Sequence, residues 1–245
     1  MMKMKYLKLY ENFIQSDSEI HKLCEEYGIT NYTINNGLVD VDGDVDLSDK
    51  GLTKLPIKFG RISDTFQCYN NQLTSFDGAP KEVGGNFYCY NNKLTTLEGS
   101  PLKVGGNFYC INCKLTSLDG SPKYIGGDFD FGFNQLTSLK GAEETISKNI
   151  ICTNNNIYKL DFVPNYKQGF GISGNPFHII WRLIKHSIEK DYTLFNHFIE
   201  NNIFRDPGYQ GDTTGLPIII LDRLNDFLDM CKLPNVEEVE GYTCI

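Results

Sequence analysis

Hydrophobic side chains recur every 21 residues through the middle of the chain. Leucine or isoleucine fills one column of positions: Leu52, Leu73, Leu94, Leu115, Leu136 and Ile157. A second column consists of Val45, Phe66, Phe87, Phe108, Phe129 and Ile150. Two further columns keep the same interval, one beginning at Ile62 and the other at Leu47. Such regularity predicts successive chain turns that stack in register, because a single turn is too small to bury its own apolar face.

Each interval contains a short segment in which hydrophobic and polar positions alternate, as they do in a β-strand. In one interval Phe87 and Cys89 alternate with Tyr88 and Tyr90. Successive side chains of a strand point to opposite faces. We therefore expect Phe87 and Cys89 to point into the core and the two tyrosines to point outward.

The rest of the interval is expected to turn the chain and bring it back. Asn91-Asn92 predicts a corner, since asparagine tolerates left-handed backbone and bonds to local amides. Leu94 and Leu97 are expected to return to the core. Gly105-Gly106 is expected to supply backbone angles that other residues cannot adopt, just before the next strand.

The repeat unit resembles the leucine-rich repeat, whose core reads L-x-x-L-x-L-x-x-N/C-x-L. The last four marked positions are filled by Phe87, Cys89, Asn92 and Leu94. Gly84 stands where the first leucine belongs. The Leu-Thr-Thr-Leu step resembles the short repeats of bacterial proteins, and the Gly-Gly-Asn-Phe-Tyr-Cys pattern resembles repeat proteins of tailed phages and their hosts. The resemblance covers about residues 40–177 and implies stacked short parallel strands, but it leaves function open because a fold does not determine function.

The resemblance also suggests a role for one polar column, formed by Asn71, Asn92, Asn134 and Asn155. It implies that these side chains bond to backbone amides of the neighbouring turn. Cys113 falls in this column, where leucine-rich repeats accept Asn or Cys. The alternative is a Cys110-x-x-Cys113 zinc pair, but a lone pair is a weak metal signal.

The other cysteines of the repeats form an inward column: Cys68, Cys89, Cys110 and Cys152. Cysteine buries well as a small hydrophobe, so we expect these residues to pack in the core. Disulfides are not expected in a reducing compartment. The sequence therefore predicts neither a disulfide framework nor a bound metal.

These patterns predict a repeat solenoid of the α+β class, with leucine-rich-repeat-like stacked parallel strands between two helical caps. We assign residues 1–37 to an N-terminal helical cap, 38–176 to a solenoid of six to seven turns, and 177–245 to a C-terminal helical capping domain. Ser16 precedes a helical pattern that stops at Gly28.

The C-terminal block loses the repeat. Helices are predicted over 177–189, 192–203 and 216–231, and residues 205–216 form a turn-rich loop. This block is expected to shield the last turn from pairing with another chain.

Residues 40–49 carry alternating aspartates, for which a calcium loop is one interpretation. The EF-hand motif needs Gly at its sixth position, whereas Gly43 comes fourth after Asp40. Val45 and Leu47 fit the inward columns. We therefore expect the aspartates to line the outer face of an early strand.

Charge and hydropathy restrict the partners that we expect. With 23 Lys and Arg against 31 Asp and Glu, the net charge is −8. That charge disfavours nucleic acid and weakly favours a basic protein surface. The N-terminus lacks a secretory pattern, and the apolar run 218–221 is too short to span a membrane. We expect a cytoplasmic protein without a membrane segment, in the host cytoplasm if it is phage-encoded.

No catalytic arrangement stands out. The four histidines are scattered: His21, His178, His186 and His197. Nothing gives them metal-ligand spacing, and no Ser-His-Asp set, phosphate loop or catalytic carboxylate pair is present. The prediction is a non-enzymatic protein without a cofactor.

The outward strand positions form the candidate partner-binding site: Gln67, Tyr69, Tyr88, Tyr90, Tyr109, Ile111, Asp128 and Asp130. Tyrosine gives a large contact area at low entropy cost and is enriched at binding hot spots. The alternative is that tyrosines simply suit strands and stack on each other. The two aspartates are placed to meet a basic residue of the partner.

The leading functional hypothesis is a protein–protein interaction module, phage- or bacterium-encoded, that binds a host or defence protein. One alternative is a small-ligand binder or enzyme centred on the C-terminal block, since the loop at 205–216 is longer and more polar than a cap needs. Another is a packaged virion or structural protein, because the first eleven residues faintly resemble the capsid-targeting leaders of packaged phage proteins.

Overall fold

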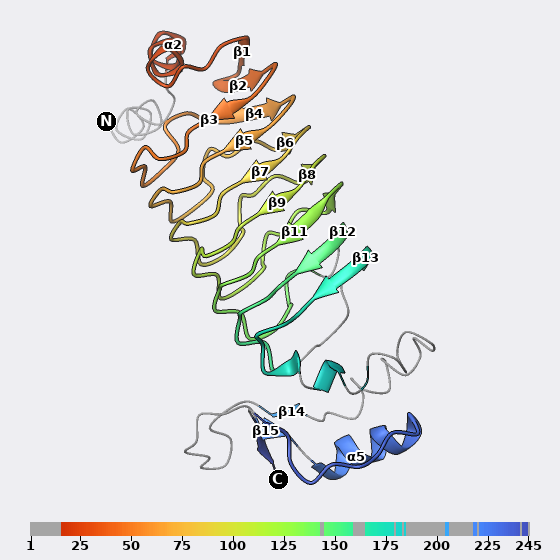
Figure 1. Ribbon diagram of the computed structural model, residues 1–245. Coiled ribbons are helices and arrows are strands. Elements are labelled where there is room, and N and C mark those ends of the chain that lie inside the picture. The colour runs from red at the N-terminus through yellow and green to blue at the C-terminus, as the bar shows by residue number, and fades with distance from the viewer. Residues whose placement is uncertain are drawn as a thin grey trace, which may run out of the picture.

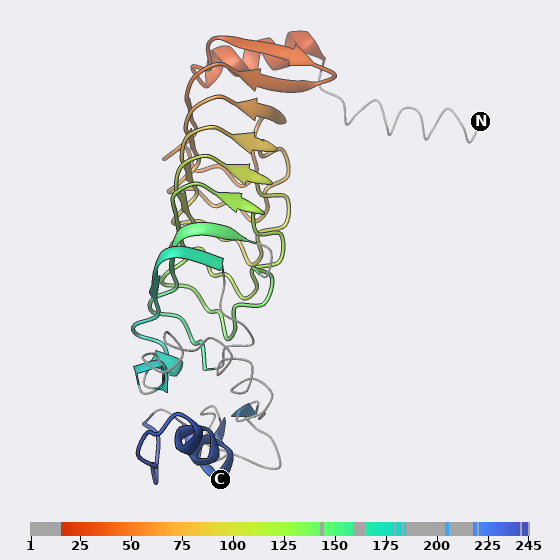
Figure 2. The ribbon, with the colours of Figure 1, turned by 90° about the vertical axis from the view of Figure 1, so that its right-hand side faces the viewer.

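The chain forms a β-solenoid of about six turns stacked along one axis (Figures 1 and 2). The computed structural model describes residues 16–142, 145–158, 165–178, 180–182, 184, 204–205, 218–219, 221–240 and 242–244. The predicted stack of short parallel strands is confirmed. Helices are few in the described residues, so the fold is mostly β rather than α+β as predicted.

Each turn contributes one strand to each of two parallel ladders. The first ladder consists of β3 (Val45–Asp46), β5 (Phe66–Gln67), β7 (Phe87–Tyr88), β9 (Phe108–Tyr109) and β11 (Asp128–Asp130). The second ladder consists of β2 (Leu38–Val41), β4 (Phe59–Ile62), β6 (Glu82–Val83), β8 (Lys103–Val104) and β10 (Tyr124–Ile125). The column that begins at Ile62 is the inward side of the second ladder, whose strands were not predicted.

The two ladders meet at the later turns. The longer strand β12 (Ile146–Ile151) pairs in parallel with both β10 and β11. β13 (Asn165–Gly171) extends the sheet beyond β12. In the first ladder each residue pairs with the residue 21 positions later, as Phe66 does with Phe87 and Phe87 with Phe108. The repeat interval of the sequence is therefore the length of one turn.

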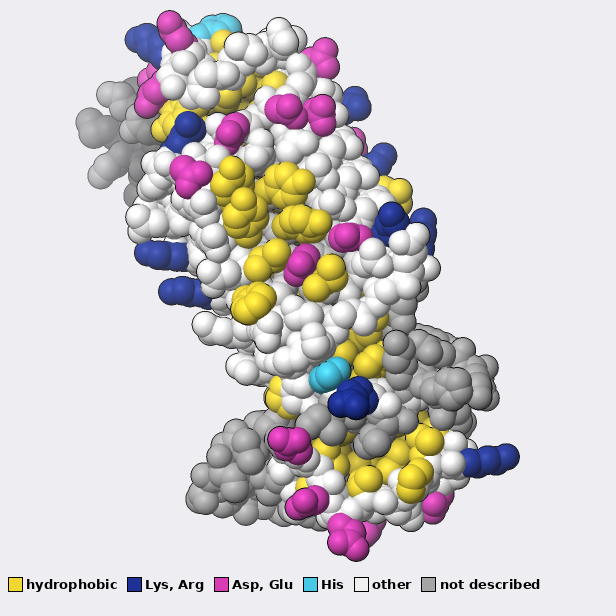
Figure 3. All heavy atoms as spheres, in the orientation of Figure 1, with side chains coloured by type: hydrophobic (Ala, Val, Ile, Leu, Met, Phe, Trp, Pro, Cys, Tyr) yellow, Lys and Arg dark blue, Asp and Glu magenta, His cyan; other side chains and the backbone are white. Residues whose placement is uncertain are grey.

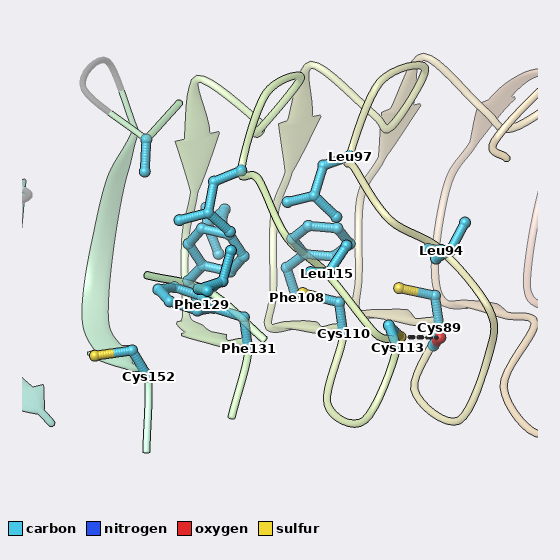
Figure 4. Packing of buried hydrophobic residues seen from close by; sticks show 14 of the residues in the cluster. Cys89, Leu94, Leu97, Phe108, Cys110, Cys113, Leu115, Phe129, Phe131 and Cys152 are labelled. Carbon is cyan, nitrogen blue, oxygen red and sulfur yellow. Dashed lines mark hydrogen bonds between the residues drawn. The ribbon is translucent and has the colours of Figure 1, made fainter. Parts of the chain in front are cut away.

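The core is a set of ladders of like side chains inside the stack. Phe66, Phe87, Phe108 and Phe129 are fully buried, and their successive ring centroids lie 5.1–5.4 Å apart. Figure 4 shows Leu94, Leu97 and Leu115 packed beside this spine. Leu52, at the first turn, is only partly buried. The predicted inward orientation of the hydrophobic columns is confirmed.

The inward cysteines are buried and reduced, as predicted. Burial raises the pKa of the Cys68, Cys89, Cys110 and Cys152 thiols. A thiol with a raised pKa stays neutral near pH 7, so each behaves as a small hydrophobe. In the described part of the chain, no group of three or more His, Cys, Asp or Glu is arranged to hold a metal ion.

A buried asparagine joins neighbouring turns at all but one position of the polar column. The Asn92 Oδ1 accepts a hydrogen bond from the Leu73 N–H at 2.9 Å, and its Nδ2 donates to the carbonyls of Cys68 and Cys89 at 3.0 and 2.8 Å. Asn71, Asn134, Asn155 and Asn175 occupy equivalent positions and bond in the same way. This confirms the role that the leucine-rich-repeat resemblance implied.

Cys113 replaces asparagine in one turn of this column. Its Sγ donates to the Cys89 carbonyl at 3.2 Å, the dashed contact in Figure 4. Its backbone N–H donates to Asn134 Oδ1 at 2.9 Å. Cys113 is therefore a column residue, as predicted.

The corners of the turns use left-handed backbone at a fixed position. Asn70, Asn91 and Asn112 have φ of 52°, 55° and 54°. Their side-chain amides also bond along the axis, with Asn91 Nδ2 donating to Asn70 Oδ1 at 2.7 Å and Asn112 Nδ2 donating to Asn91 Oδ1 at 2.9 Å. The predicted asparagine corner is confirmed. We call the row of Asn70, Asn91 and Asn112 the amide ladder.

The physical reason proposed for the Gly-Gly pairs was wrong. Gly105 and Gly106 do not have positive φ. Instead, the backbone of the preceding turn lies against them: a Cβ on Gly105 would be 2.0 Å from the Gly84 carbonyl oxygen. Gly126 meets Gly105 in the same way. Glycine is required there because adjacent turns approach too closely for any side chain.

The N-terminal segment contains a helix followed by a strand. Helix α2 (Asp17–Glu26) begins with a capping box between Ser16 and Glu19 and is followed by Gly28 at φ 68°. Both features confirm the predicted helix. Ile20 and Cys24 bury one face of α2 in the core. The segment also contains β1 (Tyr32–Asn35), antiparallel to β2, which the helical-cap prediction missed.

The early aspartates lie outside the core, as predicted. Val41, Val45 and Leu47 are buried, while Asp42 and Asp44 are exposed. The aspartates satisfy backbone groups of the next turn, as where Asp44 Oδ1 accepts from the Thr65 N–H at 2.8 Å.

The C-terminal block is less helical than predicted. Residues 177–178, 180–182 and 184 are helical, which agrees with the helix predicted over 177–189, whose other residues lie outside the described part. The described part also contains β14 (Phe204–Arg205), β15 (Ile218–Ile219), helix α5 (Leu221–Met230) and β16 (Thr243–Cys244), and the three strands form a small sheet in the order β14-β15-β16. The helix expected over 216–231 thus begins later, because the Ile218–Ile219 pair enters a sheet. The predicted helix at 192–203 lies outside the described residues, as does most of the loop at 205–216.

Candidate functional site

Four tyrosines project from the first ladder, and we call them the tyrosine face: Tyr69, Tyr88, Tyr90 and Tyr109. All four are partly exposed, as predicted, while the neighbouring Phe87 and Cys89 are fully buried. Figure 3 shows hydrophobic side chains gathered over β5, β7 and β9, with acidic side chains on either side along the stack. The stacking of turns therefore brings together residues that are 21 positions apart in sequence.

The tyrosines form two stacked pairs. The rings of Tyr69 and Tyr90 lie 4.5 Å apart between centroids and are inclined by only 9°. The rings of Tyr88 and Tyr109 lie 5.4 Å apart and are inclined by 40°. Gln67 and Ile111, which the sequence placed in the same site, are also partly exposed, and Gln67 pairs in register with Tyr88.

Two phenol groups of this face, those of Tyr90 and Tyr109, have a raised pKa. Partial burial is the main reason that the pKa of Tyr90 is raised, and the neighbouring Tyr69 raises it further. Partial burial is also the main reason that the pKa of Tyr109 is raised, and the negative charge of Asp128 raises it further. A neutral phenol can donate and accept hydrogen bonds while its ring offers an apolar contact surface. Tyr90 and Tyr109 can therefore offer both kinds of contact to a partner.

Two carboxylates border the tyrosine face on β11. Asp128 Oδ1 accepts from Asn149 Nδ2 at 2.6 Å, and Asp130 Oδ1 accepts from the Gly132 N–H at 2.9 Å. Burial raises the pKa of Asp130, the Gly132 N–H opposes that rise, and the nearby Asp128 charge adds to it. A cation placed beside this pair would relieve their mutual repulsion.

A further exposed aromatic residue was missed in the sequence. Phe133 is 59% exposed and has φ 55°. It occupies the corner column that otherwise contains Asp49, Asn70, Asn91, Asn112 and Asn154. The signal was present, since phenylalanine is the one apolar residue among these six.

Two hollows lie elsewhere among the described residues. One of about 420 Å³ lies beside Asp40, Asp42 and Arg61. Its carboxylates already bond to the next turn: Asp40 Oδ1 accepts from the Arg61 N–H at 2.7 Å. A second, of about 260 Å³, is lined by residues that include His178 and Trp181.

The histidines show no shared site in the described residues. His21 Nδ1 lies 2.6 Å from the Tyr32 hydroxyl. His186 and His197 lie outside the described residues. None of the helices in the described segments combines the length and apolar character that crossing a membrane requires.

Comparison with known proteins adds no family to this picture. No protein-family model matches the chain, and neither the curated proteins nor the solved structures give a significant match.

Proposed function

We propose that this chain is a non-catalytic scaffold of the leucine-rich-repeat type that binds a protein partner through its tyrosine face. The observation that carries the proposal is the contrast between its two ladders. The second ladder displays Arg61, Glu82, Lys103 and Tyr124 at the positions that pair across its strands, a mixed and charged set suited to water. The first ladder displays a cluster of tyrosines, although both ladders rest on the same core.

Ring stacking explains why the tyrosines occur in pairs, but it does not explain why they lie on the first ladder and not on the second. Stacked aromatic pairs contribute about 0.5–1.5 kcal/mol each beyond the area that they bury. The same gain would be open to tyrosines on the second ladder, which has strands of similar length. Concentration of neutral aromatic side chains on one rigid, partly exposed face is typical of a binding surface.

The partner class follows from the resemblance of the repeats. The Gly-Gly-Asn-Phe-Tyr-Cys pattern resembles that of repeat proteins of tailed phages and their bacterial hosts, so we propose a host or defence protein as the partner. We further propose that α2 and the C-terminal block cover the two ends of the stack. Ile20 and Cys24 of α2 are buried, and the Tyr242 hydroxyl donates to the Tyr158 carbonyl at 2.8 Å. Covered ends would shield the terminal strands from pairing with a foreign strand.

The proposal predicts that replacing Tyr88, Tyr90 and Tyr109 with alanine weakens partner binding on the order of 100-fold, because truncating central aromatic residues removes most of the binding energy of an interface. A photoreactive phenylalanine analogue at position 88, introduced in host cells that produce the protein, would crosslink the partner for identification by mass spectrometry. Titration calorimetry with the purified partner would then give the affinities.

Tyr124 provides a matched control, because it is a tyrosine on the other ladder with 40% of its surface exposed. We expect Tyr124→Ala to leave the affinity unchanged and the analogue at position 124 to yield no crosslink to the partner. Thermal melting of both variants would verify that they fold. A partner that crosslinks equally from both positions and binds the triple variant normally would rule out the tyrosine face.

A further inference from the structure

In the central outward row of the first ladder, all the charged residues are acidic. The central outward row follows directly from the strand register and consists of Asp46, Gln67, Tyr88, Tyr109, Asp130 and Ile151. This row contains no lysine or arginine, and an aspartate stands on each side of its neutral centre. Asp46 and Asp130 are four strand steps apart, which at about 4.8 Å a step is about 19 Å.

The second ladder shows that this pattern is not a general property of the protein surface. There Lys103 pairs in register between Glu82 and Tyr124, and Lys81 and Lys123 are exposed nearby. Basic residues therefore occur freely on an equivalent face of the same stack. Their absence from the central row of the first ladder leaves a potential that favours a positively charged partner.

Phe133 lies three residues beyond Asp130 and combines several unfavourable features. It holds a left-handed φ of 55°, a conformation that costs phenylalanine more free energy than asparagine or glycine. It exposes 59% of a large apolar side chain. It also ends a row of side-chain hydrogen bonds. This row begins at Asp49, which accepts from Asn70, and continues along the amide ladder to Asn112. Strain and exposure at one residue indicate a role other than stability.

We propose that the tyrosine face, together with Phe133, docks a partner segment that carries lysine or arginine on both sides of an apolar centre. The inference rests on the proposed function and specifies the chemistry of the partner. The apolar centre of the segment would lie on the tyrosines. Its two basic ends would meet Asp46 at one side and Asp128 and Asp130 at the other, with Phe133 contacting the segment at the second end.

Selection from a random library of displayed 12-residue peptides tests this directly. Peptides would be selected on the full chain and counter-selected on the Tyr88→Ala/Tyr90→Ala variant. We expect enriched sequences with a basic residue at each end of an aromatic or aliphatic centre. Enriched peptides that depend on the face but are neutral or acidic at their ends would overturn the inference and leave the proposed function intact. Failure to enrich any face-dependent peptide would count against both.

The selected peptide then permits a charge test with a matched control. Asp46→Asn with Asp130→Asn should weaken its binding roughly tenfold in low salt, because two partly exposed ion pairs are lost. Asp77→Asn with Asp119→Asn removes the same charge from exposed positions outside the face and should have no effect. Equal weakening by both pairs would show non-specific attraction to an acidic protein and refute the assignment. Concentration-dependent self-association that the peptide fails to displace would instead assign the face to a second copy of the chain.

Phe133→Asn separates binding from stability. Asparagine would relax the left-handed corner and could donate to Asn112 Oδ1, so the melting temperature should rise. Affinity for the selected peptide should fall roughly tenfold, as expected on losing an exposed aromatic contact. An unchanged affinity would remove Phe133 from the docking surface. Fluorescence anisotropy and thermal melting of the same samples provide both readings.

Discussion

Gly105→Ala should destabilise the protein by about 3 kcal/mol or more, although it adds a single methyl group. The added Cβ would lie 2.0 Å from the Gly84 carbonyl oxygen, which is backbone and cannot rotate away. Moving it would stretch the hydrogen bonds that join the two turns, from the Gly105 N–H to the Val83 carbonyl and from the Gly106 N–H to the Gly85 carbonyl, each 2.8 Å. Urea unfolding followed by circular dichroism would measure the loss.

Gly171→Ala is the matched control for that substitution. Gly171 also lies in the stack, but its nearest contact to an added Cβ is Ile151 Cγ2 at 3.7 Å, and its φ is not positive. The free energy of unfolding should change by less than about 0.5 kcal/mol. If both variants lose the same stability, close approach between turns is not the reason for the glycine pairs.

Asn92→Ala should cost about 3–5 kcal/mol, a second large effect from a small change. The Asn92 amide is buried and bonds to the Leu73 N–H and to the carbonyls of Cys68 and Cys89. Removing it leaves the Leu73 N–H in the core without its acceptor, at a cost of about 1–3 kcal/mol. It also takes one of two donors from each carbonyl, since Asn71 Nδ2 still donates to Cys68 and Cys113 Sγ to Cys89, and each lost bond costs about 0.5–1.5 kcal/mol. The free energy of unfolding, from urea titration, is again the quantity to compare.

The chain contains its own control for this experiment. Cys113 occupies the same column but contributes a donor Sγ to the Cys89 carbonyl rather than an amide. Cys113→Ala should therefore cost only about 1–2 kcal/mol, the loss of one weak bond and a small volume. Equal costs at positions 92 and 113 would show that the amide bonds contribute little and that side-chain volume controls stability in this column.

Much of the candidate site could be predicted because it depends on alternation within a strand. Once Phe87 is assigned to the core, Tyr88 must face outward, and the 21-residue interval extends the assignment to Tyr69, Tyr90 and Tyr109. The geometry of the pairs could not be predicted. Whether two rings stack at 9° or tilt at 40° depends on side-chain rotamers across neighbouring turns. Phe133 was missed because a repeating column predicts only the residues that conform to it, and Phe133 is the residue that breaks its column.

The sequence by itself determined the length of a turn, the inward and outward sets of side chains, and the asparagine column, because each is written as a periodicity that survives without coordinates. Only the tertiary structure showed that a second ladder runs beside the first, that the glycine pairs are needed for contact between turns, and that Ile218–Ile219 enters a sheet instead of starting a helix. These features depend on which backbone lies against which after folding. A local pattern does not contain that information, since it concerns residues that are neighbours only in space.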